Sequence, residues 1–167
     1  MSTEETKVAL MEAAVRVTAT SGTKALTARG IAGEAGVNQA LVYYHFDGVD
    51  GLLQAAYERA TTSMIADYLG DLTSVSSFEE LYRVGATMAE RAREDGSAAV
   101  LSTIIAGAYT NDAMAAMRHE NMERWNAAVS AAIGQVLRLR KLEGALDVEA
   151  LTASLTASTI GMMTLGS

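Results

Sequence analysis

The sequence predicts an all-α protein in which a head of three short helices precedes a larger helical-bundle body. Apolar residues recur three and four positions apart along most of the chain, which is the period of a helix with one buried face. Half of the residues are hydrophobic, and there is no proline. No helix is therefore interrupted by a missing N–H donor, and Gly, Ser, Asp and Asn must supply the breaks.

The bulk composition excludes several classes of protein. The chain has 167 residues, a net charge of −7 and no cysteine, so it has no disulfide framework, no Cys-based zinc site and no thiol nucleophile. Residues 1–7 are polar and acidic, unlike a signal peptide. The apolar stretch 151–165 is interrupted by Thr and Ser and is shorter than the roughly 20 residues of a membrane span. These features predict a soluble, cytoplasmic protein without membrane contact.

Capping residues place the helices of the head. The segment Ser2–Glu5 can form a capping box, and Thr27 and Asn38 are suitable N-caps. Gly22 and Gly36 can end helices in the left-handed conformation that glycine adopts easily. The three helices are expected at residues 2–22, 27–36 and 39–46.

A break at Asp47-Gly48 separates the head, residues 1–47, from the body, residues 48–167. Ser77–Glu80 forms a second possible capping box, and Asn111 and Asp147 are further N-caps. A polar loop is expected at 70–77. The five helices of the body are expected at residues 49–69, 77–94, 97–109, 111–142 and 147–165.

The stretch LTARGIAGEAGVNQALVYYHFDGVDGLL, residues 26–53, suggests a function for the head. Two short helices joined by a turn at Gly36 form a helix-turn-helix, whose second helix lies in the major groove of DNA. Asn and Gln at the start of that helix can read adenine, while Tyr, His and the N-terminus of the first helix suit phosphates. The alternative for these side chains is capping and aromatic packing. The predicted DNA-binding residues are Thr27, Ala28, Arg29, Asn38, Gln39, Ala40, Tyr43, Tyr44 and His45.

The same stretch resembles the tetracycline-repressor (TetR) family of transcriptional regulators. The resemblance rests on a Thr-led helix at Thr27, the Ala35-Gly36-Val37 turn, the Tyr43–Phe46 end of the recognition helix, and Leu52-Leu53. It implies a homodimer that binds a palindromic double-stranded DNA operator, most simply as a repressor, and that releases it when a small effector binds the body. Many relatives carry one more helix after the position of Leu165.

The head departs from the family pattern at several positions. Gly30 replaces an acidic residue of the first short helix, Leu41 replaces a small residue, and Gly48-Val49 replaces a Ser-Lys pair that supplies a phosphate-binding lysine. Through Asp47 the head has four basic residues against five acidic ones. Weak binding to non-specific DNA is expected. The alternative is therefore a helical ligand-binding or scaffold protein whose head no longer binds DNA.

Methionine and aromatic residues in the body predict a pocket for an apolar effector, because flexible Met side chains and aromatic rings suit adaptable apolar binding. Plain core packing is the alternative for each of them. The predicted ligand-binding residues are Met64, Tyr68, Met88, Ile104, Tyr109, Met117, Asn121 and Trp125.

The last helix predicts the subunit interface. Small residues lie close to one stripe of it, and apolar residues add area, which suits close packing of two helices; burial within one subunit is the alternative. The predicted interface residues are Leu151, Ser154, Leu155, Ala157, Ser158, Gly161, Met162 and Leu165.

No enzymatic activity is predicted. His119 and Glu123 are i, i+4 neighbours that suit an exposed pair better than a metal site. The chain has no recognisable nucleophile, metal cluster or phosphate loop. No cofactor and no metal are expected.

Overall fold

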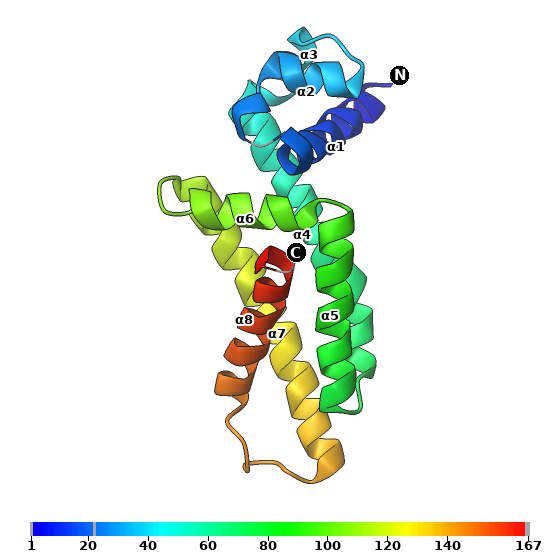
Figure 1. The fold of residues 1–167 in the computed structure, drawn as a ribbon, viewed down its shortest axis with the longest axis vertical. Coiled ribbons are helices and arrows are strands. Elements are labelled where there is room, and N and C mark those ends of the chain that lie inside the picture. Colours follow the sequence, from blue (N-terminus) through cyan, green and yellow to red (C-terminus); the bar gives the residue numbers. More distant parts are fainter. Residues whose placement is uncertain (1, 22, 166–167) are drawn as a thin grey trace. The chain divides into compact units, whose positions relative to one another are not determined.

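The computed structural model describes residues 2–21 and 23–165, and within these ranges all regular secondary structure is helical, which confirms the predicted fold class (Figure 1). Gly22, the expected end of the first helix, lies outside the described residues. The elements are α1 (Thr3–Ser21), the 3₁₀ turn η1 (Thr23–Ala25), α2 (Ala28–Ala35), α3 (Ala40–Phe46), α4 (Val49–Ser74), α5 (Phe78–Glu94), α6 (Ser97–Gly107), α7 (Asp112–Arg140) and α8 (Val148–Leu165).

The predicted caps form hydrogen bonds at the helix starts. Ser2 and Glu5 form the reciprocal capping box of α1, since the Glu5 N–H donates to Ser2 Oγ and the Ser2 N–H donates to Glu5 Oε2. Asn111 Oδ1 accepts from the Met114 N–H, and Asp147 Oδ1 accepts from the N–H groups of residues 149 and 150. Local side chains therefore satisfy N–H groups that each new helix leaves unpaired.

The fourth helix is longer than predicted. It continues through Gly70 to Ser74, where a polar loop was expected. Leu72 is buried and extends the apolar stripe of Ile65 and Tyr68, so packing of this turn outweighs the cost of about 1 kcal/mol for a helical glycine. The sixth helix ends at Gly107, two residues earlier than expected, in a turn.

The helices form two compact units, which are described separately. The first contains residues 1–61 and 96–117. In it α1 packs against α2, α6 and η1, and α2 packs against α3. Leu10, Ile31, Val42, Leu52 and Ile104 are fully or almost fully buried in its core. The head helices therefore share one core with the start of α4 and with α6.

The second unit contains residues 62–95 and 118–167. Its α5 packs along α8, and its buried side chains include Leu72, Leu81, Trp125 and Ile133. Gln135 of α7 donates from Nε2 to the carbonyl oxygens of Thr73 and Val75, which ties α7 to the α4–α5 connection. A cavity in this unit is described below.

The contact-defined first unit is wider than the head predicted at residues 1–47, because the start of α4 and all of α6 contribute to its core. The functional boundary at residue 47 stays a prediction. None of the described helices is both long and apolar enough to span a membrane.

Candidate functional site

The second helix of the helix-turn-helix, α3, exposes the side chains that the sequence predicts at DNA. Asn38, Gln39 and Ala40 are exposed, and the side chains of Tyr43 and Tyr44 are 60% and 80% exposed. Val42, by contrast, is fully buried in the core of the first unit. The helix therefore has one anchored face and one face of polar and aromatic side chains that is free for a partner.

Asn38 caps the start of α3 as predicted, from two residues before the first helical residue. Its Oδ1 accepts a hydrogen bond of 2.8 Å from the Ala40 N–H, and Gln39 already has helical backbone angles. The side-chain amide of Gln39 makes no capping hydrogen bond. Because Asn38 uses its oxygen for the cap, Gln39 is the better placed of the two for reading a base edge.

His45 is the last of the predicted DNA-binding residues in the recognition helix. His45 is half-buried and packs edge-to-face with Tyr44, with ring centroids 4.8 Å apart, and with Phe46 at 6.3 Å. This aromatic packing holds the end of α3 and leaves Tyr44 exposed.

Thr27 caps α2, where a phosphate contact is predicted. Its Oγ1 accepts a 3.0 Å hydrogen bond from the Gly30 N–H, so its own O–H is free to donate to a phosphate. Arg29 is exposed, whereas the side chain of Ala28 is buried in the core. Any contact of Ala28 with DNA would therefore come from its backbone N–H at the start of the helix.

Packing explains why position 30 is a glycine, which the sequence did not reveal. A Cβ atom at this position would lie 2.6 Å from the carbonyl oxygen of Ala25 and 3.1 Å from Thr27 Oγ1. The 3₁₀ turn η1 approaches α2 too closely for a side chain here. The glycine that breaks the family pattern thus permits the turn to pack on the helix.

Ion pairs occupy half of the basic residues in the head. Arg16 Nε lies 2.8 Å from Glu34 Oε1, and Lys7 Nζ lies 3.9 Å from Glu4 Oε2. Over the described residues no such pair is found for Lys24 or Arg29, and both are exposed. Lys24 lies in η1, three residues before Thr27, and sequence reasoning did not single it out. It was detectable in the sequence only as one of few basic residues beside the helix-turn-helix.

A buried hydrogen bond ties α4 to the head. The Tyr57 hydroxyl lies 3.0 Å from Thr18 Oγ1, which donates in turn to the carbonyl oxygen of Ala14. Tyr57 is fully buried, and this burial raises the pKa of its hydroxyl, although the hydrogen bond with Thr18 partly opposes the shift. The phenol is therefore a neutral structural link and is unavailable to a ligand.

The predicted ligand-binding residues fall in both units. Ile104 and Met117 are buried in the core of the first unit, and Tyr109, in the turn after α6, is 81% exposed. In the second unit lie Met64, Tyr68, Met88, Asn121 and Trp125. Of these eight residues only Trp125 lines the cavity described next, so a shared pocket for all of them stays a prediction.

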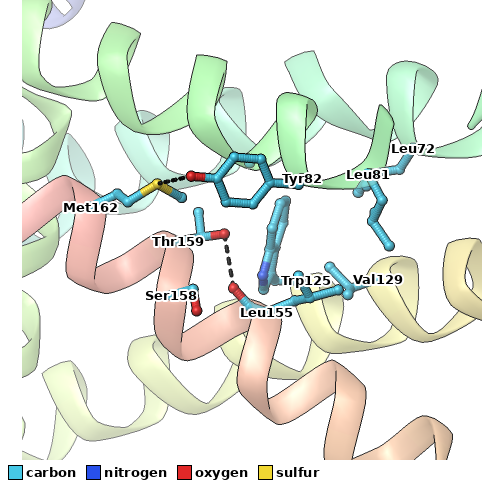
Figure 2. Close-up of a pocket in the computed structure, with 10 residues that line it drawn as sticks. Leu72, Leu81, Tyr82, Trp125, Val129, Leu155, Ser158, Thr159 and Met162 are labelled. Carbon is cyan, nitrogen blue, oxygen red and sulfur yellow. Dashed lines mark hydrogen bonds between the residues drawn. The ribbon is translucent and has the colours of Figure 1, made fainter. Parts of the chain in front are cut away.

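The second unit contains an apolar cavity between α5, α7 and α8 (Figure 2). The side chains of Tyr82, Trp125 and Met162 border it, and Leu72 closes it from α4. It leaves about 10 Å³ for the centre of a water-sized sphere, which is close to the minimum that one water molecule needs. The cavity is therefore nearly filled by its own side chains, and Tyr82 at its edge is exposed.

Close approach of α5 and α8 forms one wall of the cavity. A Cβ at Gly85 would lie 2.8 Å from Thr159 Oγ1, and the Thr159 hydroxyl donates to the carbonyl oxygen of Leu155. The Tyr82 hydroxyl donates to Met162 Sδ at 3.9 Å, and Arg93 Nη1 donates to the Met162 carbonyl oxygen at 2.6 Å. The predicted ligand-binding residues include neither Tyr82 nor Gly85, because the proximity of these residues to α8 depends on long-range packing.

A second hollow near the α4–α5 connection is open and charged, with Asp71, Glu80 and Arg83 on its walls. The N–H and the hydroxyl of Ser76 both donate to Glu80 Oε2, and these bonds lower the pKa of the carboxyl group. Glu80 therefore stays ionised as part of the N-terminal cap of α5. The role of Glu80 here is to stabilise the start of α5.

The predicted interface residues of α8 divide between two sides of the helix. Ser154, Ala157 and Leu165 are exposed, and Gly161 is half-buried with open space around its Cα. Ser158 is exposed too and lies at the edge of the cavity, whereas Leu155 and Met162 line the cavity toward α5, and Leu151 is half-buried. An interface through the exposed side of α8 stays a prediction.

Comparison with known proteins agrees with this architecture. Residues 10–56 match the sequence profile described as bacterial regulatory proteins, tetR family. None of the curated proteins matches the sequence.

Solved structures match almost the whole chain. A transcriptional regulator from Saccharomonospora viridis, in complex with choline, has a TM-score of 0.81 at 20% identity, over 96% of this chain and 84% of that one. A TetR transcription regulator from Haloarcula marismortui has a TM-score of 0.78 at 22% identity, over 95% and 84%. The regulator FadR from Bacillus subtilis, in complex with stearoyl-CoA, has a TM-score of 0.76 at 18% identity, over 95% and 85%.

Identities this low show a shared fold, and the profile match covers the helix-turn-helix with the helices on either side of it. Members of this family are regulators and are generally not enzymes. The N-terminal segment of the chain, residues 10–56, thus resembles the tetR family of bacterial regulatory proteins, and the chain as a whole shares its fold with solved structures of transcriptional regulators.

Proposed function

We propose that the protein is a cytoplasmic transcriptional repressor that binds a palindromic DNA operator as a homodimer and is released by a small, largely apolar effector. The observation that carries the proposal is the exposed side of α3, where Gln39, Tyr43 and Tyr44 stand on a helix that Val42 anchors in the core. A rigid helix with free polar side chains suits the major groove of DNA.

Gln39 is proposed to read a base, and the two tyrosines are proposed to contact phosphates. Thr27, Arg29 and Lys24 would add phosphate contacts at the other helix of the motif, because each has a free donor. Two heads related by a two-fold axis would read two half-sites, which requires a near-palindromic operator.

Effector control is supported by the narrow apolar cavity in the second unit and by the fold. Structures with this fold include one in complex with choline and one in complex with stearoyl-CoA. The effector would release DNA if it binds more tightly to the conformation in which the heads do not fit the operator.

A second candidate is a ligand-binding or scaffold protein whose head has lost DNA binding. The ion pairs of Lys7 and Arg16 favour it, because they leave few free cations in an acidic head. Phosphate contacts supply much of the affinity of a DNA-binding protein.

A binding selection from random DNA duplexes at low salt separates the two candidates. Enrichment of a palindrome that binds far more tightly than scrambled DNA is expected for the repressor. No enrichment at low salt would contradict DNA binding and favour the scaffold.

Substitution of Gln39 by Ala tests how the operator is read. Gln39→Ala should weaken operator binding by about 1–3 kcal/mol, or roughly 5- to 150-fold, and relax specificity at one position of each half-site. Fluorescence anisotropy against the selected operator measures this effect. Gln54→Ala is a matched control, since Gln54 is an exposed glutamine of α4. Equal affinities of the two variants would remove Gln39 from the reading surface.

A further inference from the structure

We propose that the connection between α7 and α8 is a second self-association surface, at which two copies of the chain meet across a two-fold axis. The surface, called here the α7–α8 patch, consists of residues 138–149 (Figure 1). It belongs to the second unit and contains none of the proposed DNA-binding residues. The contact goes beyond the proposed function, because it would join two of the proposed dimers without DNA and without an effector.

The α7–α8 patch exposes three leucines between the two helices. Leu139, Leu142 and Leu146 are 59%, 42% and 45% exposed, and residues 138–147 are all exposed. The turn that presents them is hydrogen-bonded, since the Leu142 N–H donates to the Leu137 carbonyl oxygen at 2.9 Å and Lys141 has a left-handed backbone with φ of 56°. Apolar surface on a defined turn would be stabilised by burial against a partner.

The charged side chains of the patch are separated by sign, with three cations before Leu142 and three carboxylates after it. They are Arg138, Arg140, Lys141, Glu143, Asp147 and Glu149, and all are exposed. The helix ends favour these signs, since cations suit the C-terminus of a helix and carboxylates its N-terminus. The ion pairs found over the described residues include none of the six. Charges of both signs are therefore free to pair with another molecule.

A two-fold axis through the leucines makes the patch complementary to itself. In such a contact both copies use the same surface, so each pairing of two residues occurs twice. The basic half of one copy then faces the acidic half of its partner, and the leucines of both copies pack between these pairs. The arrangement satisfies the charges and the apolar surface together.

Other partners fit the patch less well. A wholly anionic surface, such as the phosphates of DNA or of an acidic membrane, would attract the three cations and repel the three carboxylates beside them. Exposed leucines also gain nothing against phosphates. The patch requires a partner with apolar residues between the two signs of charge in the reverse order, and a second copy turned about a two-fold axis supplies it.

The contact should be weak and reversible, because the patch is small. A standard protein interface has about 20–30 residues on each side, and the patch has only residues 138–149. Its ion pairs are exposed at the rim, so they determine the orientation more than the strength of the contact, and salt should weaken them. We therefore expect association at high micromolar protein concentration and low salt.

Sedimentation velocity of the full chain measures this association without DNA. The Ala157→Asp background separates it from the proposed α8 interface. Whichever species that interface leaves at low micromolar concentration, the patch should double its mass as the concentration rises. A mass that stays constant to high micromolar concentration at low salt would overturn the contact. Loss of the α8 dimer with doubling retained would contradict only the proposed dimer, so the two failures are distinguishable.

Two charge-reversal variants test the pairing. Arg138→Glu/Arg140→Glu moves the net charge of the patch from zero to −4, and Glu143→Lys/Glu149→Lys moves it to +4. Asp147 is left unchanged because it caps α8. Neither variant alone should double its mass, because like charges would face each other, whereas an equimolar mixture should. Doubling by either variant alone, or no association in the mixture, would overturn the two-fold arrangement.

A leucine pair tests the apolar part of the contact. Leu139→Ser should weaken the association about tenfold, as truncation at the centre of an interface does. Leu69→Ser is the matched control at a leucine of α4 that is 40% exposed, and it should leave the association unchanged. Circular dichroism establishes that each variant is folded. Full association of folded Leu139→Ser would place the contact outside the patch.

Discussion

At the scale of single residues, some glycines are required because another segment packs against them, whereas others stand where a side chain would fit. Gly30 and Gly33 both lie in the short helix α2, yet only Gly30 faces another segment, the carbonyl of Ala25 in η1. A helical glycine normally costs about 1 kcal/mol relative to alanine. The cost at Gly30 is offset by the close approach of η1, whereas the cost at Gly33 has no such compensation.

Gly30→Ala should therefore lower the free energy of unfolding by about 1–2 kcal/mol, because the new Cβ must displace backbone. Gly33→Ala is the matched control and should raise it by up to about 1 kcal/mol, since nothing lies within 4 Å. Urea denaturation measures both changes. Stabilisation by both substitutions would show that η1 does not pack closely on α2.

At the scale of elements, one side of α8 packs within the subunit, and its exposed side is proposed to form the dimer interface. Its buried side contacts α5 and α7, where Thr156 Oγ1 donates to Asn126 Oδ1 and Thr159 packs on Gly85. Arg93 of α5 binds a carbonyl in the last turn of α8, where carbonyl groups lack helical partners and a positive charge is favourable. These contacts determine how tightly the cavity is closed.

Arg93→Ala should lower the free energy of unfolding by about 0.5–1.5 kcal/mol through the loss of this hydrogen bond between helices. Arg83→Ala removes an exposed arginine from the same helix, where Arg83 Nη2 lies 2.9 Å from Glu79 Oε1, and should cost at most about 0.5 kcal/mol. Chemical denaturation compares the two variants. A larger loss for Arg83→Ala would contradict the role of Arg93 in holding α8.

At the scale of the whole molecule, the proposed DNA-binding residues and the apolar cavity of the body belong to different compact units. Helices α4 and α7 each contain residues of both units. The effector can control DNA binding only by its different affinity for two conformations of the protein. The proposed dimer adds a constraint, since both heads must fit one operator.

Ala157→Asp tests the proposed dimer. A charge on the exposed side of α8 would be buried without a partner in a helix-to-helix interface, so a dimer should convert to monomers at micromolar concentration. Sedimentation velocity measures the mass. Ala116→Asp, at an exposed alanine of α7, is the control and should leave the dimer intact. A dimer that survives Ala157→Asp would move the interface away from this side of α8.

The sequence by itself determined the class of fold and the positions of most helices. Capping residues such as Ser2, Thr27, Asn111 and Asp147 act on N–H groups within three residues, so their effect is visible without the rest of the structure. The helix-turn-helix was predictable for the same reason, because its turn at Gly36 has the expected left-handed backbone. Capping and turn interactions join residues that are close together in the sequence, so the sequence alone can predict them.

Only the tertiary structure decided which side chains meet across the chain. It extended α4 through Gly70 because Leu72 has a core to enter, and it required Gly30 because Ala25 lies against it. It also brought Tyr82 of α5 beside Met162 of α8, eighty residues away, and so formed a cavity that includes one of the eight predicted ligand residues. These outcomes depend on packing between segments distant in sequence, and periodicity within one helix does not specify its neighbour.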